Sequence, residues 1–369
     1  MNYKDIYEQW LNDGRLCPEG KKELEAIKDN EEEIEYRFGA ELAFGTAGLR
    51  GIIGYGTNMM NIYTVKRATQ GLSEFIKTLG EEAKKRGVVI SYDTRRKSDE
   101  FAMAAADVLA ANGIKAYVFP DVHPVPMLSF AVRCLKTIAG IMITASHNPK
   151  QYNGYKVYGE DGAQMNPEDT AKVLGFIEKQ TDYLGAPAAD EMQRAKLIKA
   201  VPSAVDRKYY RALKKLTLSK EAVKKCGKNL KLVYTPVHGS GYIPVTTILK
   251  KIGINATVVE EQTRKDPDFS TVEVPNPEFK ETLSMGIALA EKIGATVVFG
   301  TDPDSDRLGV AVKNKSGEFE ALSGNQVGIL LLDYILTRLK EDGKLPANAA
   351  VVKSFVTTGM ARAICNKFG

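Results

Sequence analysis

The chain repeats one alternation of hydrophobic and polar positions. Each copy has a short apolar segment, a polar loop, a segment whose apolar residues recur every three or four positions up to a glycine, and a second apolar segment. The copies comprise residues 88–92, 98–113 and 114–119, then residues 230–234, 242–253 and 254–259, and finally residues 350–356 and 359–364, where the third copy stops. Short apolar runs between turn residues are typical of buried strands, and the wider spacing is typical of amphipathic helices. The pattern therefore predicts strand–helix–strand units with parallel strands and right-handed crossovers.

This alternation predicts an α/β fold of repeated layered domains with mixed, mainly parallel sheets. A chain of 369 residues exceeds the usual size of one domain. We place the first domain at residues 1–205, the second at 206–323 and the incomplete start of a third at 324–369, with residues 186–216 connecting the first two. Because the third copy lacks its returning strand, we expect the sequence to be part of a longer protein, truncated at its C-terminal side.

Local signals predict several helix boundaries. Ser98 is expected to be the N-cap of the helix in the first copy, and Gly113 is expected to end it. Asn166 is the expected N-cap of a helix that begins at Pro167. Residues 62–79 carry apolar side chains at three- and four-residue intervals, which predicts a helix that faces the core.

Composition excludes several classes of protein. Lysines and arginines number 51 and acidic residues 46, and because they interleave, we expect solvated helix faces rather than a surface for nucleic acid. The longest apolar segment, residues 327–336, contains Asp333 and is too short to cross a membrane, and we expect no signal peptide. The four cysteines are far apart, which argues against a zinc site or disulfides and favours a cytoplasmic protein. No pattern predicts the oligomeric state.

Three aspartates, Asp302, Asp304 and Asp306, alternate with other residues after an apolar segment, and Arg307 follows them. Residues two apart in an extended segment point to the same side, so the carboxylates can converge on one cation. The spacing resembles the start of an EF-hand loop, but Arg307 and Lys313 occupy the positions of that loop's glycine and bidentate glutamate. Three oxygen ligands with open positions suit Mg²⁺ that also binds a phosphate. A solvated acidic turn is the alternative.

Residues 144–149, Thr-Ala-Ser-His-Asn-Pro, follow the apolar segment 138–143. The Ser146 hydroxyl at the end of a strand can carry a phosphoryl group. Together with the aspartates and an arginine, it supplies the groups that phosphoryl transfer requires. A Ser–His hydrolase and a turn hydroxyl that caps the backbone are the alternatives. Because adjacent residues on an extended backbone point apart, we expect Ser146 and His147 to be badly placed to hydrogen-bond, and a Gly-x-Ser-x-Gly elbow is missing. The serine and aspartate loops follow corresponding strands of the first two copies, so they are expected to converge on one cleft.

Three further segments supply candidate side chains. Residues 44–51 form a glycine-rich loop in which Thr46 and Arg50 are candidates for phosphate binding, although a tight turn with a surface arginine would look the same. Lys156 lies among tyrosines, where partial desolvation would suit it to proton transfer; a lysine at a strand edge is the alternative. His238 ends the first strand of the second copy and is a candidate either for substrate contact or for backbone capping.

Together these runs resemble the α-D-phosphohexomutases, the phosphoglucomutase/phosphomannomutase family. The resemblance covers the whole chain and rests mainly on residues 144–149 and 302–307. Residues 45–51 and 235–239 resemble the branch of many bacterial phosphoglucomutases and the eukaryotic phosphopentomutases. The resemblance implies that Ser146 is the phosphoserine, that its phosphate with Asp302, Asp304 and Asp306 ligates Mg²⁺, that Arg307 and Arg50 contact phosphoryl oxygens, and that His147 and Lys156 assist proton transfer.

The function that this resemblance implies is that of an isomerase acting on small sugar phosphates. It would interconvert sugar 1-phosphate and 6-phosphate, most simply those of glucose, through a phosphoserine and a bisphosphate, with Mg²⁺ as cofactor and glucose 1,6-bisphosphate as phosphorylating activator. Phosphopentomutase and phosphomannomutase activities are alternatives, because the family's sugar-recognition loop and its fourth-domain phosphate loop are absent from this sequence. For the same reason we expect impaired turnover. Alternatives of another class are a non-catalytic fragment that binds Mg²⁺ or sugar phosphates, and a slow phosphatase.

Overall fold

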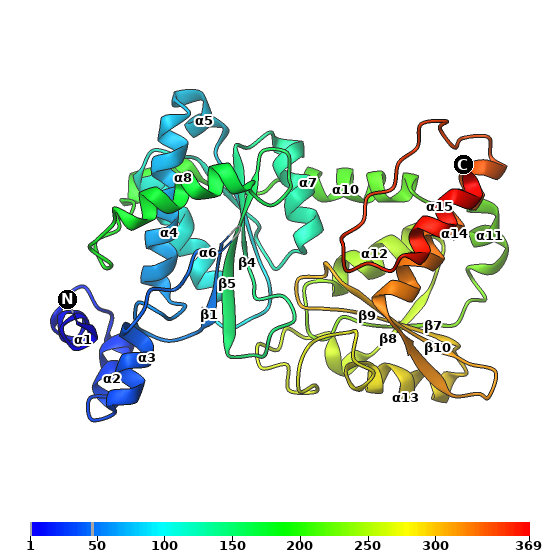
Figure 1. Cartoon of the computed structure of the whole chain (residues 1–369), viewed down its shortest axis with the longest axis horizontal. Coiled ribbons are helices and arrows are strands. Elements are labelled where there is room, and N and C mark those ends of the chain that lie inside the picture. The colour runs from blue at the N-terminus through cyan, green and yellow to red at the C-terminus, as the bar shows by residue number, and fades with distance from the viewer. Residues whose placement is uncertain (1, 46–47) are drawn as a thin grey trace. The chain divides into compact units, whose positions relative to one another are not determined.

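The computed structural model describes residues 2–45 and 48–369, which form two compact units (Figure 1). The first unit extends to Asp206 and includes Asp266–Asp268, and the second comprises Arg207–Lys265 and Phe269–Gly369. In this division residues 324–369 belong to the second unit. The three domain boundaries expected from the sequence stay a prediction.

The first unit combines helices with one mixed sheet. Its helices are α1 (Tyr3–Asn12), α2 (Pro18–Ala26), α3 (Glu31–Phe38), α4 (Ile62–Thr78), α5 (Glu81–Arg86), α6 (Ser98–Ala111), α7 (Val125–Leu135), α8 (Pro167–Glu178) and α9 (Glu191–Leu197). Its strands are β1 (Gly48–Ile52), β2 (Val88–Tyr92), β3 (Ala116–Val118), β4 (Ala139–Ile143), β5 (Tyr152–Gly159) and β6 (Ile198–Ala200). Helix α10 (Ala204–Lys215) contains the boundary between the units.

The six strands follow the order β1-β5-β4-β2-β3-β6. Strands β4, β2, β3 and β6 are parallel to one another, whereas β5 and β1 run antiparallel. The register of β2 against β4 aligns Tyr92 with Ile143, so the segments that follow both strands leave the sheet at one edge. In open α/β sheets this edge, at the carboxyl ends of the parallel strands, is where ligands bind.

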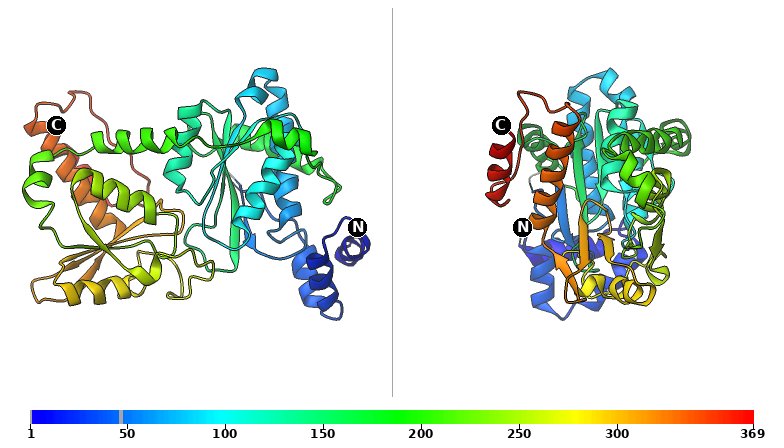
Figure 2. Two further views of the ribbon diagram at one scale, coloured as in Figure 1. Left: turned by 180° about the vertical axis from the view of Figure 1, so that it is seen from behind. Right: turned by 90° about the vertical axis from the view of Figure 1, so that its right-hand side faces the viewer.

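Helices cover both faces of the first sheet (Figures 1 and 2). Val88 and Ile90 of β2 pack in one hydrophobic cluster with α4, α6 and α8, whereas the intervening Val89 packs in a second cluster with α7. This alternation follows from the two-residue period of a strand. It explains why β2 is apolar at successive positions: both of its faces are buried.

The second unit repeats the arrangement on a smaller sheet. Its helices are α11 (Lys220–Cys226), α12 (Tyr242–Ile252), α13 (Ser284–Ile293), α14 (Gly324–Glu341) and α15 (Met360–Phe368), with short 3-10 helices η1 (Glu260–Gln262) and η2 (Glu281–Leu283). Its strands are β7 (Leu232–Thr235), β8 (Ala256–Val258), β9 (Val297–Thr301), β10 (Leu308–Lys313) and β11 (Phe319–Leu322), in the order β11-β10-β9-β7-β8. The order β10-β9-β7-β8 matches β5-β4-β2-β3 of the first sheet, with the same parallel and antiparallel pairs. The predicted fold of repeated α/β layers with mixed sheets is confirmed.

Several sequence predictions about local structure are confirmed and one is wrong. Asn166 caps α8 by accepting a hydrogen bond from the backbone N–H of Asp169. Gly113 and Gly253 follow α6 and α12 with φ of 73° and 94°, the left-handed geometry that ends helices. Ser98, however, is the first residue of α6 rather than its N-cap, and its hydroxyl donates to Asp93 Oδ1 at 2.8 Å. A capping hydroxyl accepts a hydrogen bond from a backbone N–H, whereas the Ser98 oxygen accepts one from the side-chain amide of Asn153 at 3.0 Å.

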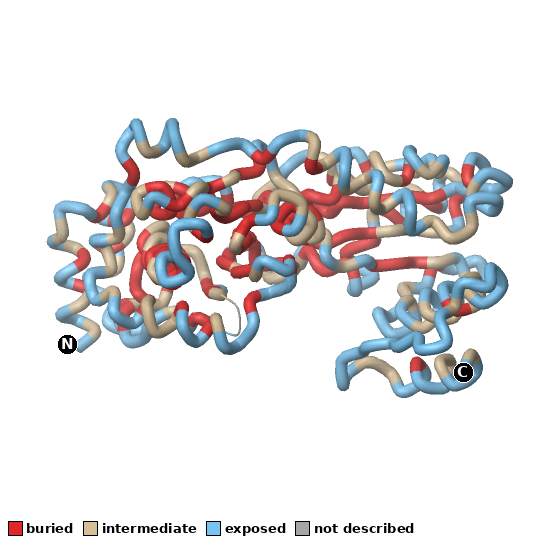
Figure 3. The backbone as a smooth tube through the Cα atoms, turned by 90° about the horizontal axis from the view of Figure 1, so that it is seen from above, coloured by how far each residue is buried: buried red, intermediate tan, exposed pale blue. Residues whose placement is uncertain are grey.

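Two further expectations need correction. Residues 186–216 are not simply a connection, because they contain β6, which pairs in parallel with β3 at the edge of the first sheet. Residues 350–356 form no strand, and Val352 and Phe355 are each 96% exposed. A strand needs a neighbour for its backbone groups, and in the described part of the chain none pairs with this segment. Figure 3 shows that burial is concentrated in the strands and the helix faces that pack on them.

One structural finding bears on membranes: throughout residues 2–45 and 48–369, every helix is too short or too polar to cross a bilayer.

The core of the first unit gives a direct stability prediction. Leu72 of α4 is fully buried in the cluster that covers the sheet, whereas Leu79, directly after α4, is 47% exposed. We expect Leu72→Ala to lower the free energy of unfolding by about 2–5 kcal/mol, because it removes buried methyl groups and leaves a cavity. Leu79→Ala should change it by less than about 0.5 kcal/mol. Urea unfolding followed by the fluorescence of Trp10, the single tryptophan, measures both; equal losses would contradict the packing described.

Candidate functional site

The two loops with predicted chemistry leave their sheets at equivalent points. The serine loop (residues 144–149) follows β4, and the acidic loop (residues 301–307) begins at the last residue of β9. In each sheet this strand has a parallel neighbour on one side, β2 or β7, and an antiparallel one on the other, β5 or β10. The expectation that the loops occupy corresponding places in the two repeats is confirmed.

Ser146 lies in a tight turn rather than in extended backbone. Its φ is 52°, a left-handed conformation that costs an L-residue roughly 1–2 kcal/mol. Its N–H donates to Thr144 Oγ1 at 2.8 Å, and the side chain is buried. A serine is held in such a turn only where the surroundings determine it, which is common at functional sites.

The turn brings Ser146 and His147 together. Ser146 Oγ lies 3.2 Å from His147 Nδ1, within hydrogen-bond distance. The expectation that these adjacent residues point apart is therefore wrong: it assumed extended backbone, and the left-handed φ of Ser146 redirects its side chain. The hydroxyl and the imidazole nitrogen can therefore share a hydrogen bond.

Arg50 of the glycine-rich loop lies beside the serine loop. Its strand, β1, pairs with β5 so that Arg50 faces Gly154, and its Nη1 donates to Asn148 Oδ1 at 3.2 Å. The guanidinium is exposed, which leaves it accessible to an anion. Gly48 permits this approach, because with a φ of 148° an added Cβ would lie 1.9 Å from the carbonyl oxygen of Tyr155. Thr46, the other candidate of this loop, lies outside the described residues.

Lys156 is half-buried on β5, where the register pairs it with Met142 of β4 and Gly48 of β1. Its neighbour Tyr155 is fully buried, and burial raises the pKa of the Tyr155 phenol. Tyr155 therefore stays neutral near pH 7. The role of Lys156 in proton transfer stays a prediction.

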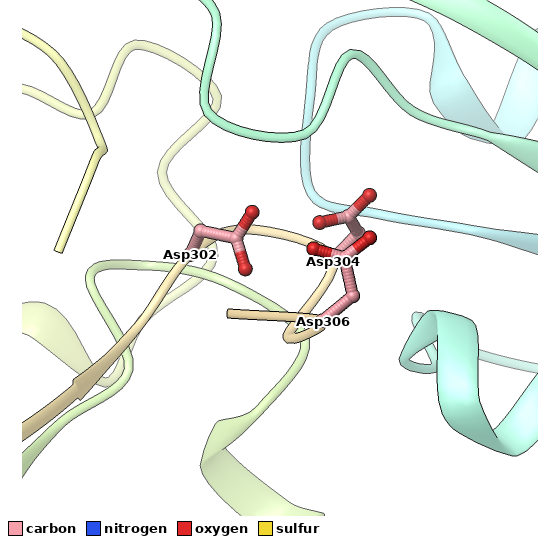
Figure 4. Close-up of side chains that lie close together, drawn as sticks. All are labelled: Asp302, Asp304 and Asp306. Carbon is pink, nitrogen blue, oxygen red and sulfur yellow. The ribbon is translucent and has the colours of Figure 1, made fainter. Parts of the chain in front are cut away.

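The acidic loop gathers its three carboxylates. One carboxylate oxygen from each of Asp302, Asp304 and Asp306 lies within 4.8 Å of the others (Figure 4). Carboxylate oxygens are the ligands that hard cations such as Mg²⁺ prefer, so three of them gathered in one loop suit such a cation. Asp302 and Asp304 are fully buried, and buried carboxylates need a cation or donors to offset their lost hydration. The donor set therefore fits Mg²⁺.

Backbone contacts hold the acidic loop in shape. Ser305 has a φ of 51°, and its N–H donates to the carbonyl oxygen of Asp302 at 2.9 Å. The loop after β7 braces it: the N–H and the hydroxyl of Ser240 both donate to the carbonyl oxygen of Pro303 at 2.8 Å. Gly239 is required at this contact, since a Cβ there would lie 2.6 Å from the Cα of Pro303.

Arg307 and His238 differ in how accessible they are. The backbone N–H of Arg307 donates to Asp302 Oδ1 at 3.1 Å. The Arg307 side chain is 39% exposed, and its guanidinium lies 3.8 Å from the carboxylate of Glu278. His238 is fully buried, with Nδ1 3.1 Å from the carbonyl oxygen of Arg264 and Nε2 2.8 Å from the hydroxyl of Thr271. These contacts agree with the capping alternative for His238, and its role in substrate binding stays a prediction.

Sequence reasoning missed Asp93 and Arg95, which follow β2 and hydrogen-bond to the serine loop. Both side chains are fully buried, and Arg95 Nε lies 3.4 Å from Asp93 Oδ2. Arg95 donates to backbone carbonyls of the serine loop, and Asp93 accepts from Thr144. Their position directly after a parallel strand, at the edge where ligands bind, is the sequence signal that could have revealed them.

Comparison with protein families assigns both units. Residues 41–184 match "Phosphoglucomutase/phosphomannomutase, alpha/beta/alpha domain I", and residues 207–317 match domain II of the same family. The chain therefore belongs to the phosphoglucomutase/phosphomannomutase family, as the sequence runs predicted.

Individual relatives agree with this assignment. A phosphopentomutase of Pongo abelii is 38% identical over 98% of this chain, and a phosphoglucomutase of Staphylococcus epidermidis is 39% identical over 90% of it. The chain spans about 60% of the length of these curated relatives, 61% and 59% respectively. Among solved structures, a putative phosphomannomutase from Thermus thermophilus is 28% identical with a TM-score of 0.65, covering 82% of this chain and 62% of its own.

Proposed function

We propose that this chain carries the phosphoserine and metal-binding parts of an intramolecular phosphotransferase that interconverts sugar 1-phosphate and 6-phosphate, with glucose as the favoured sugar. The observation that carries the proposal is the Ser146 hydroxyl, held in a left-handed turn at the carboxyl end of β4 and 3.2 Å from His147 Nδ1. Membership of the family, and relatives named phosphoglucomutase and phosphopentomutase, support it.

In the proposed loading step a phosphoryl group moves from a sugar bisphosphate to Ser146. The bond between Ser146 Oγ and phosphorus forms as the bond between phosphorus and the sugar oxygen breaks. The hydroxyl proton passes to His147 Nδ1, and the departing sugar oxygen takes up a proton, for which Lys156 is the candidate donor. For isomerisation, the same residues in opposite roles pass the group from phospho-Ser146 to the free hydroxyl of a sugar monophosphate, which gives a bisphosphate. The other phosphate of that bisphosphate then returns to Ser146 by the loading step, and the isomeric monophosphate is released.

Charge on the moving group must be neutralised. Arg50 is proposed to bind phosphoryl oxygens through its exposed guanidinium, next to Asn148 of the serine loop, and Arg307 is proposed for the same role. Asp302, Asp304 and Asp306 are proposed to hold Mg²⁺. When bound, Mg²⁺ would supply positive charge for the oxygens of the transferred phosphoryl group.

Intact-mass spectrometry tests the proposal. The protein is incubated with glucose 1,6-bisphosphate and Mg²⁺, and the expected result is a stable mass increase of one phosphoryl group per chain. This measurement follows the loading step alone, which suits a chain that spans about 60% of its relatives' length. Continuous release of inorganic phosphate without a stable adduct would favour a slow phosphatase instead, and binding without labelling would favour a non-catalytic fragment.

The sugar itself has two candidates, because relatives named phosphopentomutase and phosphoglucomutase match at 38% and 39% identity. The two candidates can be distinguished by the rate at which each sugar monophosphate removes the phosphoryl group from the phosphorylated protein. Faster discharge by glucose 1-phosphate than by ribose 1-phosphate is expected for a phosphoglucomutase, and the reverse order would favour a phosphopentomutase.

Arg50 gives a further prediction. Because its guanidinium is proposed to bind phosphate, Arg50→Ala should raise the concentration of glucose 1,6-bisphosphate that gives half-maximal labelling by about tenfold, equivalent to about 1.4 kcal/mol. Arg133→Ala is the matched control, since Arg133 is an exposed arginine on α7 of the same unit. A titration of the labelling rate measures both variants. If they behaved alike, Arg50 would have no specific role.

A further inference from the structure

We infer that the buried Asp93–Arg95 ion pair is the positioning device of the serine loop: it holds Ser146 in its left-handed turn and so sets the rate at which the hydroxyl accepts a phosphoryl group. The inference rests on the proposed function and deepens it. Neither residue is proposed to touch substrate, so both are positioning residues. Their effect would pass through the backbone of the serine loop.

The guanidinium of Arg95 hydrogen-bonds to the backbone around Ser146. Its Nη2 donates to the carbonyl oxygens of Ser146, at 2.7 Å, and of Asn148. Its Nη1 donates to the carbonyl oxygens of Pro149 and Tyr152, at 2.9 and 3.1 Å. The two terminal nitrogens carry four N–H groups, and all four meet backbone carbonyls between residues 146 and 152. One planar group therefore fixes the course of the whole turn.

Asp93 holds the other side of the Ser146 peptide. Its Oδ2 accepts a hydrogen bond from Thr144 Oγ1 at 2.7 Å, and Thr144 Oγ1 accepts one from the N–H of Ser146 at 2.8 Å. Arg95 meanwhile binds the carbonyl of Ser146. Both backbone groups of Ser146 are thus tied to the same ion pair, the N–H through Thr144 and the carbonyl directly.

The pair is itself held rigidly. Asp93 Oδ1 accepts from the N–H of Arg95 at 2.9 Å and from the hydroxyl of Ser98 at 2.8 Å. Asn153, fully buried on β5, donates to the Ser98 hydroxyl at 3.0 Å. The network joins the end of β2, the start of α6 and β5, which are parts of the core of the unit. A loop fastened to these elements keeps its geometry while substrate binds and leaves.

The burial of the Arg95 guanidinium explains why it is paired with a carboxylate. A guanidinium that is fully buried needs a negative partner, and Asp93, also fully buried, supplies it 3.4 Å away. Neutral donors would bind carbonyls more weakly than a charged one does. Arg95 can therefore bind four carbonyls strongly, while Asp93 compensates its positive charge.

The test compares Arg95→Ala and Arg95→Lys with wild type in the rate of phosphoserine formation from glucose 1,6-bisphosphate. A displacement of about 1 Å at a reacting atom costs about 10²-fold in rate, so we expect the maximal rate of both variants to fall by about that factor. The sugar-phosphate concentration for half-maximal rate should change by less than about threefold, because Arg95 is not proposed to contact substrate. Lysine keeps the charge beside Asp93 but has a single nitrogen, so it cannot replace two nitrogens that serve four carbonyls.

Arg86→Ala is the matched control. Arg86 also donates to carbonyls that flank β4, those of Lys136 and Thr137 at 2.8 and 3.3 Å, but at the opposite end of the strand from Ser146. Its loss should leave the labelling rate within about twofold of wild type, since surface substitutions have small effects. Equal rate losses in the Arg86 and Arg95 variants would mean that Arg95 acts through general stability.

Amide hydrogen exchange supplies a readout that does not depend on catalysis. In Arg95→Lys, peptides that cover residues 144–152 should exchange faster, while peptides from α4 and β3 should not change. If the wild-type protein is labelled but the Arg95 variants label at the wild-type rate, or their amide exchange is unchanged, the inference is overturned and the proposed function stands. An unlabelled wild type would overturn the proposed function and the catalytic part of the inference together.

Discussion

Replacement of Ser146 by alanine is expected to abolish labelling by glucose 1,6-bisphosphate while leaving the fold unchanged. The alanine removes the Oγ that is proposed to form the phosphoester, and no neighbouring hydroxyl shares its position: Thr144 Oγ1 is occupied by Asp93 and by the N–H of Ser146. No phosphorylated species should be visible above the detection limit of intact-mass spectrometry.

Ser203→Ala is the control for this prediction, because Ser203 is an exposed serine of the same unit that lies outside the serine loop. It should label at the wild-type rate. A Ser146→Ala protein that still gained a stable phosphoryl group would place the acceptor elsewhere and refute the assignment of Ser146.

Replacement of Asp304 by asparagine should weaken Mg²⁺ binding and slow labelling by about two to three orders of magnitude. Asp304 is fully buried, and the change removes one negative charge from the three carboxylates while preserving volume. This fall in rate is the size expected when one preorganised electrostatic group is removed from an active site. Isothermal titration with Mg²⁺ and the labelling rate measure the two effects separately.

Asp333→Asn is the matched control for Asp304, because the Asp333 side chain is 50% exposed on α14 of the same unit. It should bind Mg²⁺ and label as the wild type does. Removal of the cation with a chelator should reproduce the Asp304→Asn rate in the wild-type protein, and Mg²⁺ should then restore it. Labelling that is insensitive to the chelator would exclude a role for the cation in this step.

The strands and the acidic loop were predictable because their information is local. The sequence places strand β2 at residues 88–92 as observed, because a strand buried on both faces carries a run of successive apolar residues, here Val88 to Ile90. The sequence also names the three aspartates that gather, Asp302, Asp304 and Asp306, but a turn rather than extended backbone brings them together: Ser305 has a φ of 51° and its N–H donates to the carbonyl oxygen of Asp302.

The geometry of the serine loop was not predictable, because distant residues impose it. Ser146 adopts a left-handed φ through contacts with Arg95 and, by way of Thr144, with Asp93, about 50 positions earlier in the chain. Local sequence rules favour extended backbone for serine after a strand, and they therefore separated Ser146 from His147. Tertiary hydrogen bonds overrode that preference.

The error at residues 350–356 has a related cause. The segment is apolar enough for a strand, but a strand also needs a paired neighbour, and sequence composition does not encode whether one is present. Ser98 shows the same limit on a smaller scale: its hydroxyl binds other side chains, donating to Asp93 and accepting from Asn153, and the local sequence does not reveal these contacts.

The most direct test of the account is site-resolved mass spectrometry of the wild-type protein after incubation with glucose 1,6-bisphosphate and Mg²⁺. The account predicts one phosphoryl group, located on Ser146 in the peptide that contains residues 144–149. A phosphoryl group on any other residue, or a protein that stays unmodified under these conditions, would contradict it.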